Sequence, residues 1–212
     1  MKNYLTEFIG TFFLVLTIGL TVLDGTPLAP LAIGSALMVM VFMGGHISGA
    51  HYNPAVSLAV FLRGRMDSAL EMVYYWIAQI LGAFVAAVVV FICVDTFAPA
   101  PGGDASLLSV LLIEFLFTFA LALVVLNSAT AKGTEGNSFY GLAIGFTVTV
   151  GAFAGGSISG GAFNPAVGIG PILMDVIAGG GPITNIWVYI VAPLAGGAVA
   201  AYVFKFQNPG DE

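Results

Sequence analysis

The tripeptide Asn-Pro-Ala occurs twice in this chain, and each copy lies inside a longer repeated segment. Residues 46–56 read His-Ile-Ser-Gly-Ala-His-Tyr-Asn-Pro-Ala-Val, and residues 157–167 read Ser-Ile-Ser-Gly-Gly-Ala-Phe-Asn-Pro-Ala-Val. Asn is a preferred N-cap residue and Pro is favoured at the first helical position, so each copy predicts a glycine-rich loop that enters a short helix. The chain must therefore hold two equivalent loop–helix units, whose boxes are Asn53, Pro54 and Ala55, and Asn164, Pro165 and Ala166.

A second pair of matching segments extends the repeat beyond the two boxes. Residues 7–12 read Glu-Phe-Ile-Gly-Thr-Phe and residues 114–119 read Glu-Phe-Leu-Phe-Thr-Phe, so they agree at every position but two. We therefore predict one membrane channel domain over residues 1–212, built from internal repeats at 1–95 and 106–205. The loop-like stretch 97–104 between them is expected outside the membrane.

Composition places the chain in a lipid bilayer. Hydrophobic residues make up 59% of it and charged residues only 8%, whereas about a quarter of the residues in soluble domains are charged. A membrane crossing needs about 20 apolar residues, and six segments qualify: 4–23, 29–45, 68–94, 107–127, 139–154 and 184–205. Two further segments, 53–62 and 164–174, are too short to cross. The expected fold class is an all-α membrane protein with six transmembrane helices and two re-entrant half-helices shielded by them.

The basic residues predict the orientation of the chain. Lys and Arg in short loops favour the cytoplasmic side, and all five of them fall on one side of the predicted spans: Lys2, Arg63, Arg65, Lys132 and Lys205. Both termini are therefore expected in the cytoplasm, with the protein integral to the inner cell membrane. Three spans in each half is an odd number, so the halves insert in opposite orientations, which places a site at the midplane between broken helices.

This inverted arrangement predicts a mechanism of passive permeation. The half-helices enter from opposite faces and their N-termini meet, so two positive dipole ends of about half a charge each converge and repel cations and protons. Unwound backbone around 46–52 and 157–163 offers carbonyl acceptors, and the Asn amides offer donors. Water and small neutral solutes can pass such a path.

At these residues the chain resembles the aquaporin family, also called the major intrinsic proteins. Both Asn-Pro-Ala boxes match, as do the Glu-Phe-x-x-Thr-Phe stretches, the Gly-His-Ile-Ser-Gly segment at 45–49 and the Ala-Gln pair at 78–79. The resemblance implies a right-handed six-span bundle, a homotetramer with one pore per subunit, and no cofactor. It also implies that Glu7 and Glu114 accept hydrogen bonds from the re-entrant loops, which agrees with the cost of an unpaired carboxylate at membrane depth.

One departure from the family pattern concerns selectivity. The family usually has an Arg directly after the second box, where this chain has Val167. The resemblance places Ile33, Ala152 and Gly161 around it in the constriction, which is then wide and apolar. Some plant vacuolar-membrane members also carry Val and are similar to channels for urea, ammonia or hydrogen peroxide, while glycerol-facilitating members usually have Arg-Asp. We therefore expect a broad pore that passes water and at least one of glycerol, urea, ammonia and hydrogen peroxide.

Several alternatives remain open at this stage. The pore could be strictly water-selective, or the chain could be a secondary transporter, for which only Glu7 and Glu114 supply titratable groups. It could also be a structural membrane protein with a closed pore. His46 and His51 could titrate and gate the pore at mildly acidic pH, or they could hydrogen-bond loop backbone. An enzyme and a metal site are not expected, because no nucleophile–base pair or ligand cluster can be assembled.

Overall fold

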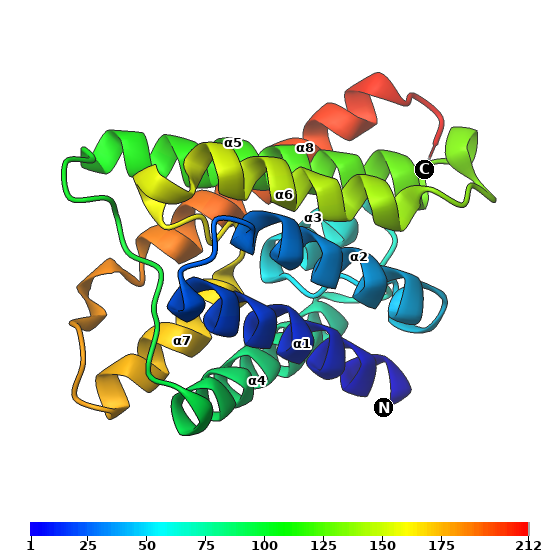
Figure 1. Cartoon of the computed structure of the whole chain (residues 1–212). Helices are drawn as coiled ribbons and strands as arrows, with labels where there is room; N and C mark the ends of the chain where they lie inside the picture. Colours follow the sequence, from blue (N-terminus) through cyan, green and yellow to red (C-terminus); the bar gives the residue numbers. More distant parts are fainter. Residues whose placement is uncertain (212) are drawn as a thin grey trace.

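The structure, a computed structural model that describes residues 1–211, is built from α-helices. Six of them are long and apolar enough to cross a membrane, and they confirm the predicted fold class (Figure 1): α1 (Lys2–Asp24), α2 (Ala29–Ser48), α4 (Ala69–Cys93), α5 (Leu107–Val125), α6 (Tyr140–Ser159) and α8 (Val188–Gln207). Two shorter apolar helices are α3 (Pro54–Arg63) and α7 (Pro165–Ile177). A π-helical segment η1 (Leu126–Thr130) and two short 3₁₀ helices, η2 (Lys132–Thr134) and η3 (Ile183–Asn185), complete the order.

The same helix contacts recur in the two halves of the chain. Helix α1 packs against α4, and α5 packs against α8 in the same way. A methyl group at Gly82 would lie 2.4 Å from the Phe8 carbonyl oxygen, and one at Gly196 would lie 2.5 Å from the Phe115 carbonyl oxygen. Small residues let helix backbones approach this closely in membranes. Helices α2 and α6 join the halves.

The ends of α2 and α6 lie beyond their predicted positions. The sequence predicted ends at residues 45 and 154, whereas the helices continue to residues 48 and 159. Glycines near these ends lie inside the helices and allow close packing: Gly44 leaves room for the Tyr52 hydroxyl, and Gly155 leaves room for Ile113. Gly49 caps α2 and Gly160 caps α6, both in the left-handed conformation. The unwound backbone is therefore shorter than predicted, at 49–52 and 160–163.

Helix α7 is also longer than predicted, running to residue 177 rather than 174. It ends in a Schellman motif: the Gly180 N–H donates to the Asp175 carbonyl at 2.8 Å, and the Gly179 N–H donates to the Val176 carbonyl at 3.2 Å. Gly179 has a φ of +84°, which a residue with a side chain rarely adopts. The helix thus stops at the first glycine able to cap it.

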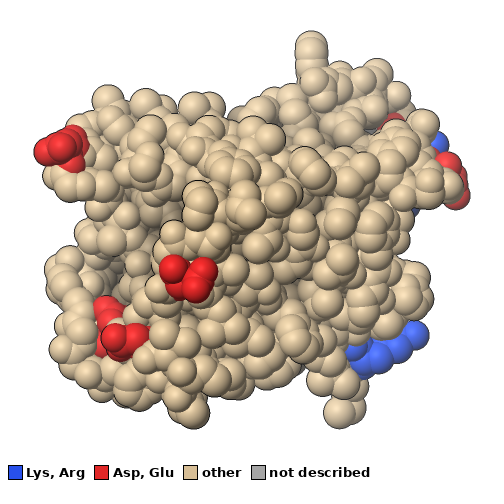
Figure 2. Space-filling view, viewed as in Figure 1, with Lys and Arg blue, Asp and Glu red and all other residues tan. Residues whose placement is uncertain are grey.

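Charged side chains gather at the two ends of the helix bundle. In Figure 2 the visible Lys and Arg side chains lie at the end where Figure 1 places both chain termini, and acidic side chains lie at the opposite end as well. Large hydrophobic side chains are exposed along the helices, among them Phe13, Phe42 and Phe146, as lipid contact requires. The chain is an integral membrane protein.

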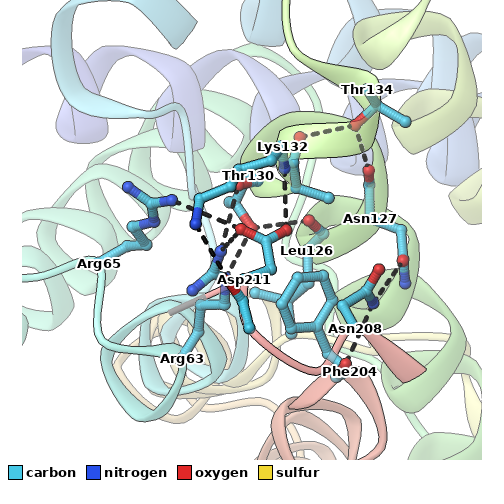
Figure 3. Close-up of polar contacts among 12 residues, drawn as sticks. Arg63, Arg65, Leu126, Asn127, Thr130, Lys132, Thr134, Phe204, Asn208 and Asp211 are labelled. Carbon is cyan, nitrogen blue, oxygen red and sulfur yellow. Dashed lines mark hydrogen bonds and ion pairs between the residues drawn. The ribbon is translucent and has the colours of Figure 1, made fainter. Parts of the chain in front are cut away.

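Asp211 joins three segments at the end of the bundle that carries the termini (Figure 3). Its carboxylate accepts hydrogen bonds from the Arg63 guanidinium at 3.0 Å and from the Lys132 backbone N–H at 2.8 Å. Arg65 lies 3.9 Å away. The Arg63 side chain is buried, and it stacks 4.7 Å from the ring centre of Phe204. This contact ties the last residues of the chain to the C-terminus of α3.

We predict that Asp211→Asn lowers the melting temperature of the detergent-solubilised protein slightly at pH 7. The Lys132 N–H and the nearby Arg63 hold the pKa of Asp211 below its usual value. A carboxyl with a lowered folded-state pKa stabilises the protein above the unfolded-state pKa of about 4, and this contribution disappears as the pH falls. The difference between wild type and variant should therefore shrink on acidification. A difference that grows at low pH, or an equal effect of Asp67→Asn, would contradict the proposed contact.

Candidate functional site

Both Asn-Pro-Ala boxes form the N-terminus of a short helix. The Oδ1 atom of Asn53 accepts a hydrogen bond from the Ala55 N–H at 2.9 Å, and Oδ1 of Asn164 accepts one from the Ala166 N–H at 2.9 Å. The intervening Pro residues take the first helical position, where a missing N–H costs nothing. Each Asn is therefore an N-cap whose amide nitrogen remains free to donate elsewhere.

The two amide nitrogens join the half-helices to each other. Asn53 Nδ2 donates to the Phe163 carbonyl at 2.9 Å, and Asn164 Nδ2 donates to the Tyr52 carbonyl at 2.8 Å. Each box thus binds the residue that precedes the other box. The N-termini of α3 and α7 consequently lie against one another in the interior of the bundle.

The loops before the boxes adopt an unusual backbone conformation. Tyr52 and Phe163 have φ values of 50° and 48°, and Ala50 and Gly161 have values of 52° and 64°. Left-handed backbone costs roughly 1–2 kcal/mol per residue with a side chain, so other interactions must hold these loops. The two buried glutamates supply them.

Glu7 lies in α1 and is fully buried. Its carboxylate accepts four hydrogen bonds: Oε1 from Ser48 Oγ at 2.6 Å and the His51 N–H at 3.0 Å, and Oε2 from the Tyr52 N–H at 2.7 Å and Gln79 Nε2 at 2.8 Å. Hydrogen bonds to an ionised acceptor are stronger than neutral ones. The carboxylate thereby aligns successive N–H groups of the strained loop.

Glu114 in α5 holds the second loop in the same way. Its Oε1 accepts from Ser159 Oγ at 2.7 Å and from the Ala162 N–H at 3.0 Å, and its Oε2 accepts from the Phe163 N–H at 2.7 Å. The hydroxyl of Tyr189 adds a bond to the Ser159 carbonyl at 2.6 Å. Both carboxylate oxygens of Glu114 thus accept hydrogen bonds from the second loop or the end of α6.

The first half carries polar groups that the second half lacks. Gln79 Nε2 also donates to Ser57 Oγ at 2.9 Å, and Ser57 Oγ lies 3.1 Å from Nδ1 of the buried His51. Counted from the second box, the positions of His51 and Ser57 are taken by Ala162 and Gly168. Among the described residues, the partner of the His51 ring is thus the Ser57 side chain. No role was predicted for Ser57, and Gln79 was noted only as part of the family resemblance, although a Gln inside an apolar span is itself a signal of a buried polar contact.

A cavity of about 390 Å³ contains both Asn side chains of the boxes. All four residues predicted for the constriction line it, namely Ile33, Ala152, Gly161 and Val167. The neighbouring Gly151 faces Phe117 and Phe163 instead, which places Ala152 on the cavity side of α6. Among the described residues that line this cavity, none is Lys, Arg, Asp or Glu. Residues 97–100 also line it, which the sequence did not predict.

A second cavity, of about 860 Å³, opens toward the end of the bundle that carries the termini. His46 is exposed in it, and charged residues such as Arg65, Glu71 and Lys132 surround it. His51 and Val125 line both cavities. The two cavities therefore lie next to each other, with His51 and Val125 between them.

The chain matches known proteins over nearly its whole length. The family model described as Major intrinsic protein matches residues 1–204, a range that includes both boxes. Glycerol uptake facilitator protein-like 6 of Lactiplantibacillus plantarum is 37% identical, with 100% of both chains covered. Probable aquaporin TIP2-2 of Oryza sativa subsp. japonica is 37% identical over 97% of this chain and 87% of that protein. The solved structure of the aquaglyceroporin from Plasmodium falciparum has a TM-score of 0.87 and 25% identity, covering 99% and 98% of the two chains.

We predict that Glu114→Gln destabilises the protein by roughly 2–4 kcal/mol, because hydrogen bonds to charged groups contribute about 1.5–3 kcal/mol each. The Gln amide must also turn one N–H toward a loop donor. Thermal unfolding of the detergent-solubilised protein measures the effect, and Glu135→Gln, at an exposed position, is the matched control. Equal melting temperatures for the two variants would show that packing, and not the carboxylate, holds the loop.

Proposed function

Because the chain belongs to the major intrinsic protein family, we propose that it is a passive channel through which water and small neutral solutes cross the membrane. The observation that carries this proposal is the reciprocal pairing of Asn53 and Asn164, which both line one cavity that lies next to a second cavity on the side of the termini. A path lined by helix N-termini and apolar side chains suits a neutral permeant. The solutes in question are glycerol, urea, ammonia and hydrogen peroxide.

The paired half-helices are proposed to exclude ions and protons. Each helix N-terminus carries a positive partial charge of about half a unit, and two such ends face the same point. Each Asn Nδ2 uses one of its N–H groups for the facing loop, which leaves a second donor for a permeant oxygen. A cation meets repulsion and desolvation there, whereas water keeps its hydrogen bonds.

The loop backbone supplies acceptors along the path. Within residues 1–211, six loop carbonyls have no hydrogen-bond donor: those of Gly49, Ala50, His51, Gly160, Gly161 and Ala162. The ring of Ile33, Ala152, Gly161 and Val167 adds no side-chain donor. Solutes that themselves donate N–H or O–H bonds can therefore replace lost hydration at this point. All four proposed solutes do so.

The proposed assembly is a homotetramer in the inner cell membrane with both termini in the cytoplasm. The five basic residues support this orientation, because Lys and Arg favour the cytoplasmic side. The secondary-transporter alternative is disfavoured by Glu7 and Glu114, whose oxygens are taken up by loop donors. The alternative of a strictly water-selective pore is decided by the flux measurement described next.

Stopped-flow light scattering on proteoliposomes tests the proposal. Osmotic water flux and the uptake of glycerol and urea are compared with those of protein-free vesicles. Fast water with uptake of at least one solute is the expected result. Fast water without solute uptake would assign a strictly water-selective pore, and flux equal to the protein-free level would contradict the channel.

We predict that Val167→Arg lowers solute permeability by about tenfold or more, which corresponds to about 1.4 kcal/mol in the barrier, and lowers water permeability less. The guanidinium adds bulk and charge at the ring, and bulk excludes larger solutes first. Val167→Leu adds bulk without charge and serves as the control. Equal loss of water and solute flux, with normal assembly, would contradict this function of the ring.

The two histidines are proposed as gating residues, because His46 is exposed in the 860 Å³ cavity and His51 lines both cavities. The His51 ring is buried, with Nδ1 3.1 Å from Ser57 Oγ, which favours a structural role for this residue. The water flux of wild type at pH 5 and pH 8, compared with that of His46→Ala and His51→Ala, tests the proposal. A wild-type flux that does not change with pH would assign both residues to structure alone.

A further inference from the structure

The segment that joins the two halves of the chain lines the 390 Å³ cavity. The sequence placed residues 97–104 simply outside the membrane. Phe97 is instead 9% exposed, and its ring packs at Gly19 of α1, where a methyl group would lie 2.4 Å from Cε1. Ala98, Pro99 and Ala100 follow it and line the same cavity as the constriction ring. These residues, with Gly102, are here called the linker.

The linker is bound to the end of α6 by backbone contact. The Gly102 N–H donates to the Ile158 carbonyl at 3.0 Å. A methyl group at Gly102 would lie 2.3 Å from the Ser157 carbonyl oxygen. A methyl group at Gly160 would lie 2.7 Å from the Ala100 nitrogen. The two segments therefore touch without room for a side chain between them.

The corresponding place in the first half has no such cover. Gly49 has the same left-handed conformation as Gly160, yet a methyl group there would meet only the His51 ring, at 3.1 Å. That side opens into the 860 Å³ cavity. The linker is thus specific to the side of the path that carries the constriction ring.

Two of the four ring residues have little or no side chain, so they cover little of the wall of the path. Ala152 and Gly161 are small, so the next surface behind them determines how far the opening extends. Gly161 follows the residue that contacts the linker directly. A shift of the linker would consequently change its contact with Gly160, the residue next to Gly161 of the ring.

We propose that the linker is a wall of the constriction and that Gly102 is a positioning residue that sets which solutes pass. This inference rests on the proposed channel function. It predicts that selectivity changes when the linker moves, even though the four ring residues keep their identity.

Gly102→Ala tests the inference, because the new methyl group must push the linker away from the Ser157 carbonyl. Gly103→Ala is the matched control, since a methyl group there has no neighbour within 4 Å. In proteoliposomes, Gly102→Ala should raise the glycerol-to-water permeability ratio by about threefold or more, which corresponds to about 0.65 kcal/mol in relative barrier height. Gly103→Ala should match wild type.

A second variant keeps the test decisive if Gly102→Ala folds poorly. Ala98→Phe adds bulk to the cavity wall and should lower the same ratio by about threefold. A wild-type ratio in either folded variant, with water flux intact, would overturn the inference and leave the channel function standing. Wild-type vesicles without water flux would overturn the channel function itself.

Discussion

The hydrogen bonds from loop N–H groups to the carboxylates of Glu7 and Glu114 determine the geometry of the whole path. They hold Tyr52 and Phe163 in the left-handed backbone conformation. Each loop therefore turns sharply into its half-helix. Only with the loops in this shape do the carbonyls of these two residues meet the amides of the opposite boxes. Both carboxylates therefore help to build the path, and their oxygens accept hydrogen bonds from N–H and O–H groups of the protein.

The duplicated halves share this framework and differ in what surrounds it. On the side of the termini, His51, Ser57 and Gln79 form a polar chain, and the adjoining cavity is large. On the opposite side, apolar residues and the linker surround a smaller cavity. An inverted repeat needs identical halves only where the half-helices meet. The residues on either side of this contact can differ between the halves. The two ends of the path are therefore lined by different kinds of side chain.

The fold class and the pairing of the boxes could be predicted because their signals are local: an N-cap followed by Pro, long apolar runs and a visible duplication. Ala152 was predicted as the ring residue on α6, and it lines the cavity with the other three predicted residues. Helix ends at Ser48 and Ser159 were misplaced, because glycines needed for close packing resemble loop residues. The linker and the contact between Arg63 and Asp211 could not be predicted, since residues 148 positions apart leave no periodic pattern.

Simultaneous measurement of water and proton flux tests the central claim most directly. Proteoliposomes that contain a pH-sensitive dye can report both the osmotic response and the proton leak under a potassium diffusion potential. If two opposed helix N-termini admit only neutral species, water flux rises with protein content while proton flux stays at the level of protein-free vesicles. A proton flux that rises in parallel with water flux would contradict the claim.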